Sequence, residues 1–301
     1  MDDTIGHDPV LLAECLDLLQ VGPGKTIVDC TLGRGGHSLA MANALGPTGT
    51  LISLDADPRN LDFARNRLAK ASTAGTVRFF HANFSDLGEV LAAAGIPQVD
   101  GILSDLGIST NQLFDDQYGL SFGSPMPLDM RIDPRSTPSA ADVVNTMRED
   151  DLANVLYELA DERYSRRIAR KIVDARRASP IITTDRLADL VRSAIPRKYG
   201  PPERIDPATR TFLALRMYVN AELHNLQKLL EDGPKLLKPN GRLAIISFQS
   251  TEDRLVKQSF RQLAEVGFMS IVTKKPVTPS DEELAINPRS RSGKLRVAQK
   301  L

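Results

Sequence analysis

The sequence has no tryptophan, five tyrosines and only two cysteines among its 301 residues. Cys15 and Cys30 lie in no paired or ligand-like spacing, so we expect neither a disulfide framework nor a structural zinc site, and we predict no metal ligands. No run approaches the roughly 20 apolar residues that a membrane-spanning helix needs, and the first residues lack the basic start and apolar stretch of a signal peptide. These absences predict a folded cytoplasmic protein without membrane partners.

Net charge is also lacking, because 38 basic residues balance 38 acidic ones. The two signs are nevertheless separated along the chain. Residues 1–110 carry 7 basic and 13 acidic residues, whereas residues 163–204 carry 12 and 4 and residues 271–301 carry 7 and 3. This distribution fits an enzyme that holds a small ligand in one part and a polyanion with another. Solvated helix faces explain the charges equally well on composition alone.

Short apolar segments alternate with helical ones in the first third of the chain. We predict strands at residues 26–30, 50–54, 77–80 and 101–103. This βαβ alternation predicts an α/β fold, with a parallel sheet covered by helices on both faces. Strand signals stop at residue 111, where arginine-rich helical segments and prolines replace them up to residue 206.

The α/β pattern resumes after Pro207. Apolar residues at spacings of three and four predict one long helix through residues 212–230. We then expect a strand at 242–248, a helix at 252–266, extended segments at 269–273 and 294–298, and a long loop at 276–292. The chain is therefore predicted to contain a discontinuous α/β domain, residues 1–110 and 207–301, with an inserted all-helical domain at 111–206.

The strongest local motif is a glycine-rich turn, Thr31 to Ser38, that joins the first predicted strand to a helix. Gly35 and Gly36 let a ligand approach the backbone, and the helix N-terminus offers N–H groups to an anionic group. Asp55, at the end of the second strand, is placed to accept hydrogen bonds from ribose hydroxyls. These features predict an adenosine-type ligand.

The spacing of the glycines favours some ligands over others. A dinucleotide fingerprint requires G-x-G-x-x-G, but Ser38 stands where the third glycine would fall. A P-loop is excluded because no Gly-Lys-Ser/Thr follows. An S-adenosylmethionine site needs only a looser glycine turn, so this cofactor fits better than a pyrophosphate.

Three further residues follow the predicted strands. Phe84 comes after the third strand, where an aromatic ring can cover an adenine, although a core phenylalanine is the commoner reading. Asp105 ends the fourth strand, at the edge where open α/β sheets bind ligands, and is a candidate for contact with the cofactor or the reacting amine. Gln112 lies just beyond and is predicted to line the same cleft.

A series of motifs extends along nearly the whole chain in a characteristic order. They are Asp8–Leu12, Thr31–Ser38, Asp100–Gly107, Pro127–Arg131, Pro207–Phe212, Ala214–Asn220, Ile246–Phe248, Glu252–Arg254 and Asn287–Ser292. On these motifs the sequence closely resembles the ribosomal RNA small subunit methyltransferase H family. The resemblance implies a class I S-adenosylmethionine methyltransferase fold, Rossmann-like, with an inserted helical domain for substrate recognition.

The resemblance also implies an activity and a site. The activity is S-adenosylmethionine-dependent methylation of the exocyclic N4 of a decoding-site cytosine in 16S rRNA of the small ribosomal subunit. The implied cofactor contacts are Gly35, Gly36, His37, Asp55, Phe84, Asp105 and Gln112. The sequence leaves the oligomeric state open, a homodimer included.

The sequence departs from the family pattern at several positions. Gln249 stands where a histidine usually follows Ser-Phe, Thr251 replaces a usual leucine, and Leu213 replaces a common glutamine. Ser109–Gln112 reads Ser-Thr-Asn-Gln where Ser-Ser-Pro-Gln is usual. A mechanism that needs a titrating histidine at position 249 is therefore in doubt.

Methyl transfer to a cytosine amine requires orientation and an acceptor for the amine protons. The candidate catalytic residues are Asp105, Asp129 and Ser247, although a helix cap is an equally good explanation of Asp129. Two other functions stay open. A nicotinamide-dependent oxidoreductase would share the glycine turn and Asp55, and a non-catalytic ribosome-assembly factor that kept the fold would explain Gln249.

Basic residues in two segments are predicted to bind the RNA. In the helical insert they are Arg163, Arg166, Arg167, Arg170, Lys171, Arg176 and Arg177, and near the C-terminus Lys274, Lys275, Arg289, Arg291, Lys294 and Arg296. On a helix, Arg163, Arg166 and Arg170 share a face through three- and four-residue spacing. Arg167 belongs to the same predicted stripe.

Overall fold

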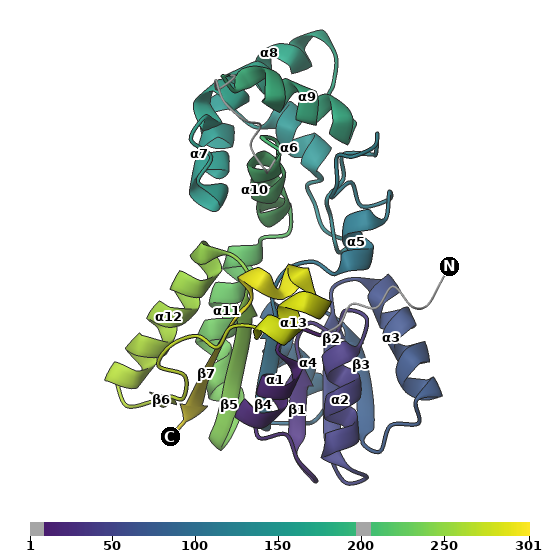
Figure 1. The fold of residues 1–301 in the computed structure, drawn as a ribbon, viewed down its shortest axis with the longest axis vertical. Helices are drawn as coiled ribbons and strands as arrows, with labels where there is room; N and C mark the ends of the chain where they lie inside the picture. The colour runs from purple at the N-terminus through teal and green to yellow at the C-terminus, as the bar shows by residue number, and fades with distance from the viewer. Residues whose placement is uncertain (1–8, 197–205) are drawn as a thin grey trace. The chain divides into compact units, whose positions relative to one another are not determined.

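The computed structural model describes residues 9–196 and 206–301 (Figure 1). Asp8 of the first family motif and residues 197–204 of the basic segment lie outside the described residues. The chain divides into two compact units. The sheet unit comprises Met1–Ser109 and Leu223–Leu301, and the helical unit comprises Thr110–Glu222.

A seven-stranded sheet of order β3-β2-β1-β4-β5-β7-β6 forms the centre of the sheet unit (Figure 1). Its strands are β1 (Thr26–Asp29), β2 (Thr50–Asp55), β3 (Thr76–His81), β4 (Val99–Asp105), β5 (Leu237–Ser247), β6 (Met269–Ile271) and β7 (Lys294–Lys300). The first five run parallel, and β7 runs antiparallel to both β5 and β6. The predicted class I, Rossmann-like α/β fold is confirmed.

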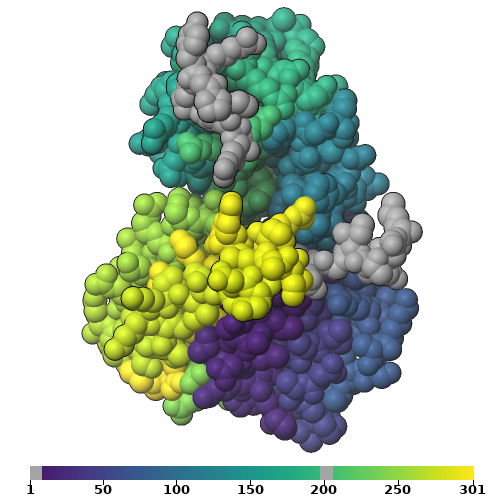
Figure 2. Space-filling model, viewed as in Figure 1, coloured from purple at the N-terminus to yellow at the C-terminus, as the bar shows by residue number. Residues whose placement is uncertain are grey.

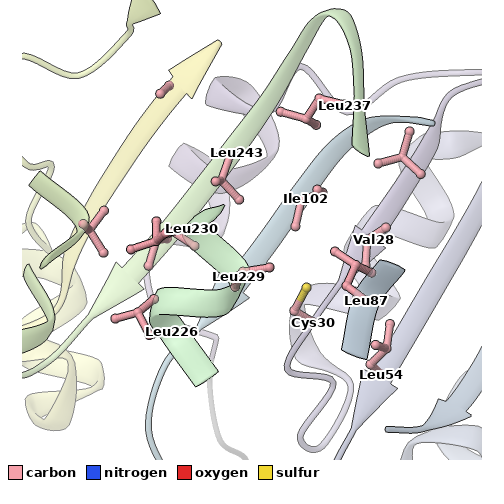
Figure 3. Packing of buried hydrophobic residues seen from close by; sticks show 14 of the residues in the cluster. Val28, Cys30, Leu54, Leu87, Ile102, Leu226, Leu229, Leu230, Leu237 and Leu243 are labelled. Carbon is pink, nitrogen blue, oxygen red and sulfur yellow. The ribbon is translucent and has the colours of Figure 1, made fainter. Parts of the chain in front are cut away.

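Helices cover both faces of this sheet. On one face lie α1 (Leu12–Leu18) and α2 (Gly36–Leu45), whose buried side chains pack on Ile27, Leu51 and Leu103. On the other lie α4 (Leu87–Ala93), α11 (Glu222–Leu236) and α12 (Ser250–Glu265). Figure 3 shows Leu226, Leu229 and Leu230 of α11 directed towards the strand residues Ile102 and Leu243. Each fully buried aliphatic side chain contributes about 1.5–3 kcal/mol, so this packing fixes the strand ends that carry the site.

Two local predictions are wrong. The single helix expected through residues 212–230 is two helices, α10 (Thr209–Val219) and α11, because Asn220 and Ala221 interrupt it and Ala221 has a φ of 49°. α10 packs on α7 (Glu149–Ala160) inside the helical unit, so the compact sheet unit resumes at Leu223 and not at residue 207.

The expected loop at residues 276–292 also contains structure, namely α13 (Asp281–Ile286) and the 3-10 helix η2 (Pro288–Ser292). The main-chain N–H of Leu11 donates to Glu283 Oε1 of α13 at 2.9 Å. Figure 2 shows the C-terminal segment, in yellow, lying against the N-terminal helix, in purple. Residues from the first and last parts of the sheet unit are thus joined by a hydrogen bond.

The helical unit consists of short amphipathic helices. They are α5 (Thr110–Phe114), α6 (Ala140–Thr146), α7, α8 (Ser165–Ala178), α9 (Thr184–Ala194) and α10. In α8, Ile168, Ala169, Ile172 and Val173 are buried, whereas Arg166 and Arg170 are exposed. In the described ranges, no helix combines the length and apolarity that crossing a membrane requires.

Candidate active site

The order of the strands defines where a ligand can enter. The chain runs outwards from β1 to β2 and β3 and then returns to place β4 on the other side of β1. A crevice forms at the carboxyl ends of the strands at such a switch point. The glycine turn follows β1 and Asp105 ends β4, so the two meet at this position. The N–H of Asp105 donates to Thr31 Oγ1 at 2.7 Å and ties them together.

The glycine turn is shaped by its backbone. Gly33 and Gly35 have φ values of 50° and 78°, in the region that side chains disfavour. A Cβ atom on Gly35 would lie 2.9 Å from Leu68 Cδ1 and 3.2 Å from Ala64 Cβ of α3 (Pro58–Lys70), so a side chain there would require these neighbours to shift. No side chain in the described residues caps the N-terminus of α2, which leaves its first N–H groups for a ligand.

Asp55 lies at the end of β2, and its carboxyl group accepts hydrogen bonds from the backbone of the glycine turn and of Asp57. Its Oδ2 accepts the N–H of Gly33 at 2.7 Å, and its Oδ1 accepts the N–H of Asp57 at 2.8 Å. Burial raises the pKa of Asp55 to about 7, although these hydrogen bonds favour the charged form. A carboxylate has about four acceptor positions, so Asp55 can still receive a ribose hydroxyl.

Asp105 is the least satisfied carboxyl group of the site. Its Oδ1 is buried and has no hydrogen-bond partner among the described residues. Burial, helped by the charges of Asp29 and Glu252, raises the pKa of Asp105 to about 8. A buried acceptor without a donor is costly, and it marks a position where a ligand can supply one.

His37 lies beside Asp105 on α2. Its Nε2 donates to the carbonyl of Val10 at 2.9 Å, and its Nδ1 lies 3.9 Å from Asp105 Oδ2. Burial lowers the pKa of His37 to about 4, so the ring is neutral and this pair is no salt bridge at neutral pH. His37 therefore anchors the segment before α1 and presents its Nδ1 lone pair to Asp105.

Strand alternation separates Ser247 from Asp105. Asp105 is in register with Ile246, so these two side chains share the face covered by α2, whereas Ser247 points to the opposite face. Phe84, in the 3-10 helix η1 (Phe84–Asp86) after β3, is partly buried against the core of that opposite face. The structure does not bring Ser247 together with Asp105.

Gln112 and Asp129 belong to the helical unit. Gln112 lies in α5 and is 4% exposed. Both oxygens of Asp129 accept from the guanidinium of Arg131, at 2.7 and 2.8 Å. Burial would raise the pKa of Asp129, but these hydrogen bonds outweigh it and lower the pKa. Such a paired carboxylate is a poor acceptor for another proton.

A known protein family matches the chain over nearly its whole length. The model of the MraW methylase family matches residues 4–301. The chain belongs to the MraW methylase family.

Named relatives align with this chain over nearly its full length. Proteins named ribosomal RNA small subunit methyltransferase H are 45% identical in Acidobacterium capsulatum and in Geobacter sulfurreducens, over 98% and 99% of this chain and 98% and 100% of theirs. An rRNA methylase of known structure from Streptococcus thermophilus is 11% identical, with a TM-score of 0.45 over 99% of each chain.

One buried network of this MraW methylase family member was not predicted. The Ser38 hydroxyl donates to Asp29 Oδ2 at 2.7 Å and lies 2.9 Å from the hydroxyl of Ser53, while the N–H of Thr31 donates to Asp29 Oδ1. The sequence signal that could have indicated this network is Asp29 at the end of a strand, two residues before Thr31, because an Asp side chain often accepts the N–H two residues on in an Asx turn. Ser38 thus ties α2 to β1 and β2 where a dinucleotide-binding turn has glycine.

Gln249 lies at the start of α12, where its backbone takes part in capping the helix. Gln249 is the N-cap residue of α12, and Glu252 Oε2 accepts the N–H groups of Phe248 and Gln249 at 3.0 and 2.9 Å. The backbone of residue 249 makes this contact, so glutamine leaves the start of α12 intact. The buried hydroxyl of Thr251 has no hydrogen-bond partner in the described part of the chain, and nothing in the structure explains that substitution.

The predicted basic residues fall into two groups. Some are used inside the protein: Arg296 and Lys294 pair with Asp253 at 2.6 and 3.7 Å, and Arg176 donates to the carbonyls of Val144 and Met147. Arg296 and Arg176 were therefore wrongly placed among the residues open to RNA, whereas the side chain of Lys294 is 38% exposed and stays a candidate. The others are exposed, namely Arg163, Arg166, Arg167, Arg170, Lys171, Arg177, Lys274, Lys275, Arg289 and Arg291.

Proposed function

We propose that this protein transfers a methyl group from S-adenosylmethionine to the N4 amine of a decoding-site cytosine in 16S rRNA of the small ribosomal subunit, in the cytoplasm. Two observations support the proposal. Relatives that match over the full chain carry the name of a small-subunit rRNA methyltransferase. The buried Oδ1 of Asp105, at the switch point of the sheet, has no hydrogen-bond partner among the described residues, which marks a position where a cofactor group can supply one.

The residues present fit S-adenosylmethionine. The glycine turn and the uncapped start of α2 lie beside two carboxyl groups, Asp55 and Asp105, with Phe84 at the end of the next strand. We propose Gly35, Gly36, His37, Asp55, Phe84, Asp105 and Gln112 as the residues that hold it. When bound, this cofactor supplies a methyl group already activated on a sulfonium.

The protein's own part in the reaction is to orient and to accept hydrogen bonds. A cytosine amine is a weak nucleophile because its lone pair is delocalised into the ring. An acceptor for its protons favours localisation of that pair. We propose Asp105 in its ionised form for this role, because its Oδ1 has no donor among the described residues. We assign Asp129 a positioning role, because Arg131 already occupies its carboxylate. Ser247 remains a candidate on the other face of the sheet.

Two alternatives are weaker. In a nicotinamide-dependent oxidoreductase the third glycine of the turn is needed for close packing, but here Ser38 is built into a buried network with Asp29. A non-catalytic assembly factor was suggested by Gln249 alone. The backbone N–H of residue 249 donates to Glu252 at the start of α12, a contact that glutamine and histidine make equally well, so the substitution leaves this part of the fold in place.

The test is methyl transfer from labelled S-adenosylmethionine to small ribosomal subunits that lack the modification, followed by nucleoside analysis. We expect label in N4-methylcytidine at a single site. Binding of cofactor and subunits without transfer would support the assembly factor instead. Label in a different nucleoside would retain the methyltransferase and overturn the assigned target.

A further inference from the structure

A hollow on the helical unit gathers basic side chains that the active site does not use. Its volume is about 340 Å³, and it lies between α8 and the end of α9. The lining residues are Arg166, Arg167, Arg170, Lys171 and Asp174 of α8 with Ser193 and Ala194 of α9. We call this the α8–α9 groove. Four cations and one carboxylate in so small a space favour an anionic ligand.

Two of these four cations form ion pairs with carboxylates of described residues, and two do not. Arg166 pairs with Asp150 at 3.0 Å and Arg170 with Glu149 at 3.3 Å, both on α7. Arg167 and Lys171 are exposed and make no hydrogen bond or ion pair with any described residue. They stand four positions apart, so they lie on the same side of α8. From the sequence, Arg167 was predicted to belong to one stripe with Arg166 and Arg170.

The paired arginines remain available as well. Arg166 and Asp150 are 68% and 84% exposed, and an ion pair so exposed contributes only about 0–1 kcal/mol. Arg166 can therefore exchange its carboxylate for a phosphate at little cost. The one carboxylate of the groove, Asp174, already pairs with Arg177 at 3.0 Å, which reduces its repulsion of an anion.

The form of the groove indicates what kind of anion it takes. It is a surface hollow between helices, lined by exposed charged side chains, and α9 contributes its C-terminal end, which offers no N–H groups to an anion. A small free anion would have no enclosed site there. A polymer with regularly spaced charges can use several weak, solvent-exposed contacts at once.

We propose that the α8–α9 groove binds the phosphodiester backbone of the rRNA substrate outside the reacting base, with Arg167 and Lys171 as its principal contacts. The inference rests on the proposed function for the identity of the RNA. The groove carries no chemistry of its own. It supplies affinity and register, which phosphate contacts provide in nucleic-acid recognition.

The experiment compares two double variants of the full chain. R167Q/K171Q removes the two unpaired cations of the groove. K257Q/R261Q removes two exposed cations at the same spacing on α12, which line no part of the groove. Binding to small ribosomal subunits, and to protein-free 16S rRNA, is measured over a series of salt concentrations, and thermal melting checks that each variant is folded.

Each phosphate contact contributes about 0.7–0.9 to the slope of log affinity against log salt concentration. We expect R167Q/K171Q to lower that slope by about 1.4–1.8 and to raise KM for subunits, with kcat and cofactor affinity unchanged. The charge-preserving variant R167K/K171R should keep the slope. K257Q/R261Q should also keep it.

An unchanged slope in R167Q/K171Q, or an equal loss in both glutamine variants, would overturn the proposal. A loss seen with intact subunits but not with protein-free rRNA would assign the groove to an acidic ribosomal protein and overturn it too. Failure of the proposed function is distinguishable, because it shows as absent methyl transfer in the unaltered protein, whereas salt slopes need no turnover.

Discussion

At the scale of single residues, Asp105 combines a role in the site with a cost to the fold. Its folded-state pKa of about 8 lies above its ordinary value of 3.8. Between those two pH values the unfolded chain ionises while the folded protein keeps the proton, so the native state loses stability as pH rises. One pKa unit corresponds to about 1.4 kcal/mol.

D105N removes this penalty, and we expect it to raise the free energy of unfolding by roughly 2–4 kcal/mol at pH 7 while weakening cofactor binding.

The measurement is denaturant unfolding of wild type and D105N from pH 4 to pH 8. The gain in the free energy of unfolding of D105N should vanish near pH 4 and grow towards pH 8.

Asp253 gives a control of opposite sign. Burial would raise its pKa, but Arg296 outweighs burial and lowers it, so D253N should destabilise the protein at pH 7 by roughly 1–3 kcal/mol. That deficit should shrink as the pH falls below 4. A D105N variant less stable than wild type at pH 8 would contradict the argument.

The sequence could indicate these residues but not their states. Asp55 and Asp105 were predicted from their positions at strand ends, and both lie there. The free Oδ1 of Asp105 and the pairing of Asp129 with Arg131 depend on side-chain geometry that spacing does not reveal. The use of Arg296 and Lys294 by Asp253 is likewise a contact between distant segments, which a local charge pattern cannot predict.

At the scale of elements, the start of α12 depends on Glu252. This carboxylate is 3% exposed and accepts two N–H groups that α12 cannot satisfy itself. We expect E252A to lower the free energy of unfolding by about 1–3 kcal/mol, because two donors lose their partner. E252Q keeps an acceptor oxygen and should lose less. Q258A, an exposed position on the same helix, is the control and should change stability by less than about 0.5 kcal/mol. Chemical denaturation measures all three, and equal losses would refute the assignment.

Strands were easier to predict than helix breaks. Each strand expected from apolar runs is present. In β1, β2 and β4, which are largely buried, this follows because burial on both faces of a parallel sheet requires continuous apolar sequence. The interruption between α10 and α11 escaped prediction, since the apolar stripe continues through it. What breaks the helix is Asn220, whose side chain accepts from the N–H of Ile132 and donates to the carbonyl of Met130. That partner lies far away in the sequence.

At the scale of the whole molecule, a ligand of the sheet unit should protect one part of the chain more than the other. S-adenosylmethionine at a hundred times its Kd adds about 2.7 kcal/mol to the state that binds it. We expect hydrogen exchange followed by mass spectrometry to show slower exchange around the glycine turn and the ends of β2 and β4. NAD at the same concentration is the control for the oxidoreductase alternative and should leave exchange unchanged. Protection by NAD alone would reverse the assignment of the cofactor.

The antiparallel strand β7 gives the molecule a particular order of assembly during synthesis. β7 is the partner of both β5 and β6, yet it follows them in the chain. At about 5–20 residues per second, the ribosome needs about 2–10 s to pass from the end of β5 to the start of β7. During that interval the edge of β5 has no neighbour and is open to pairing with another nascent chain. An enzyme proposed to act on ribosomes is thus most exposed to aggregation while it is still attached to one.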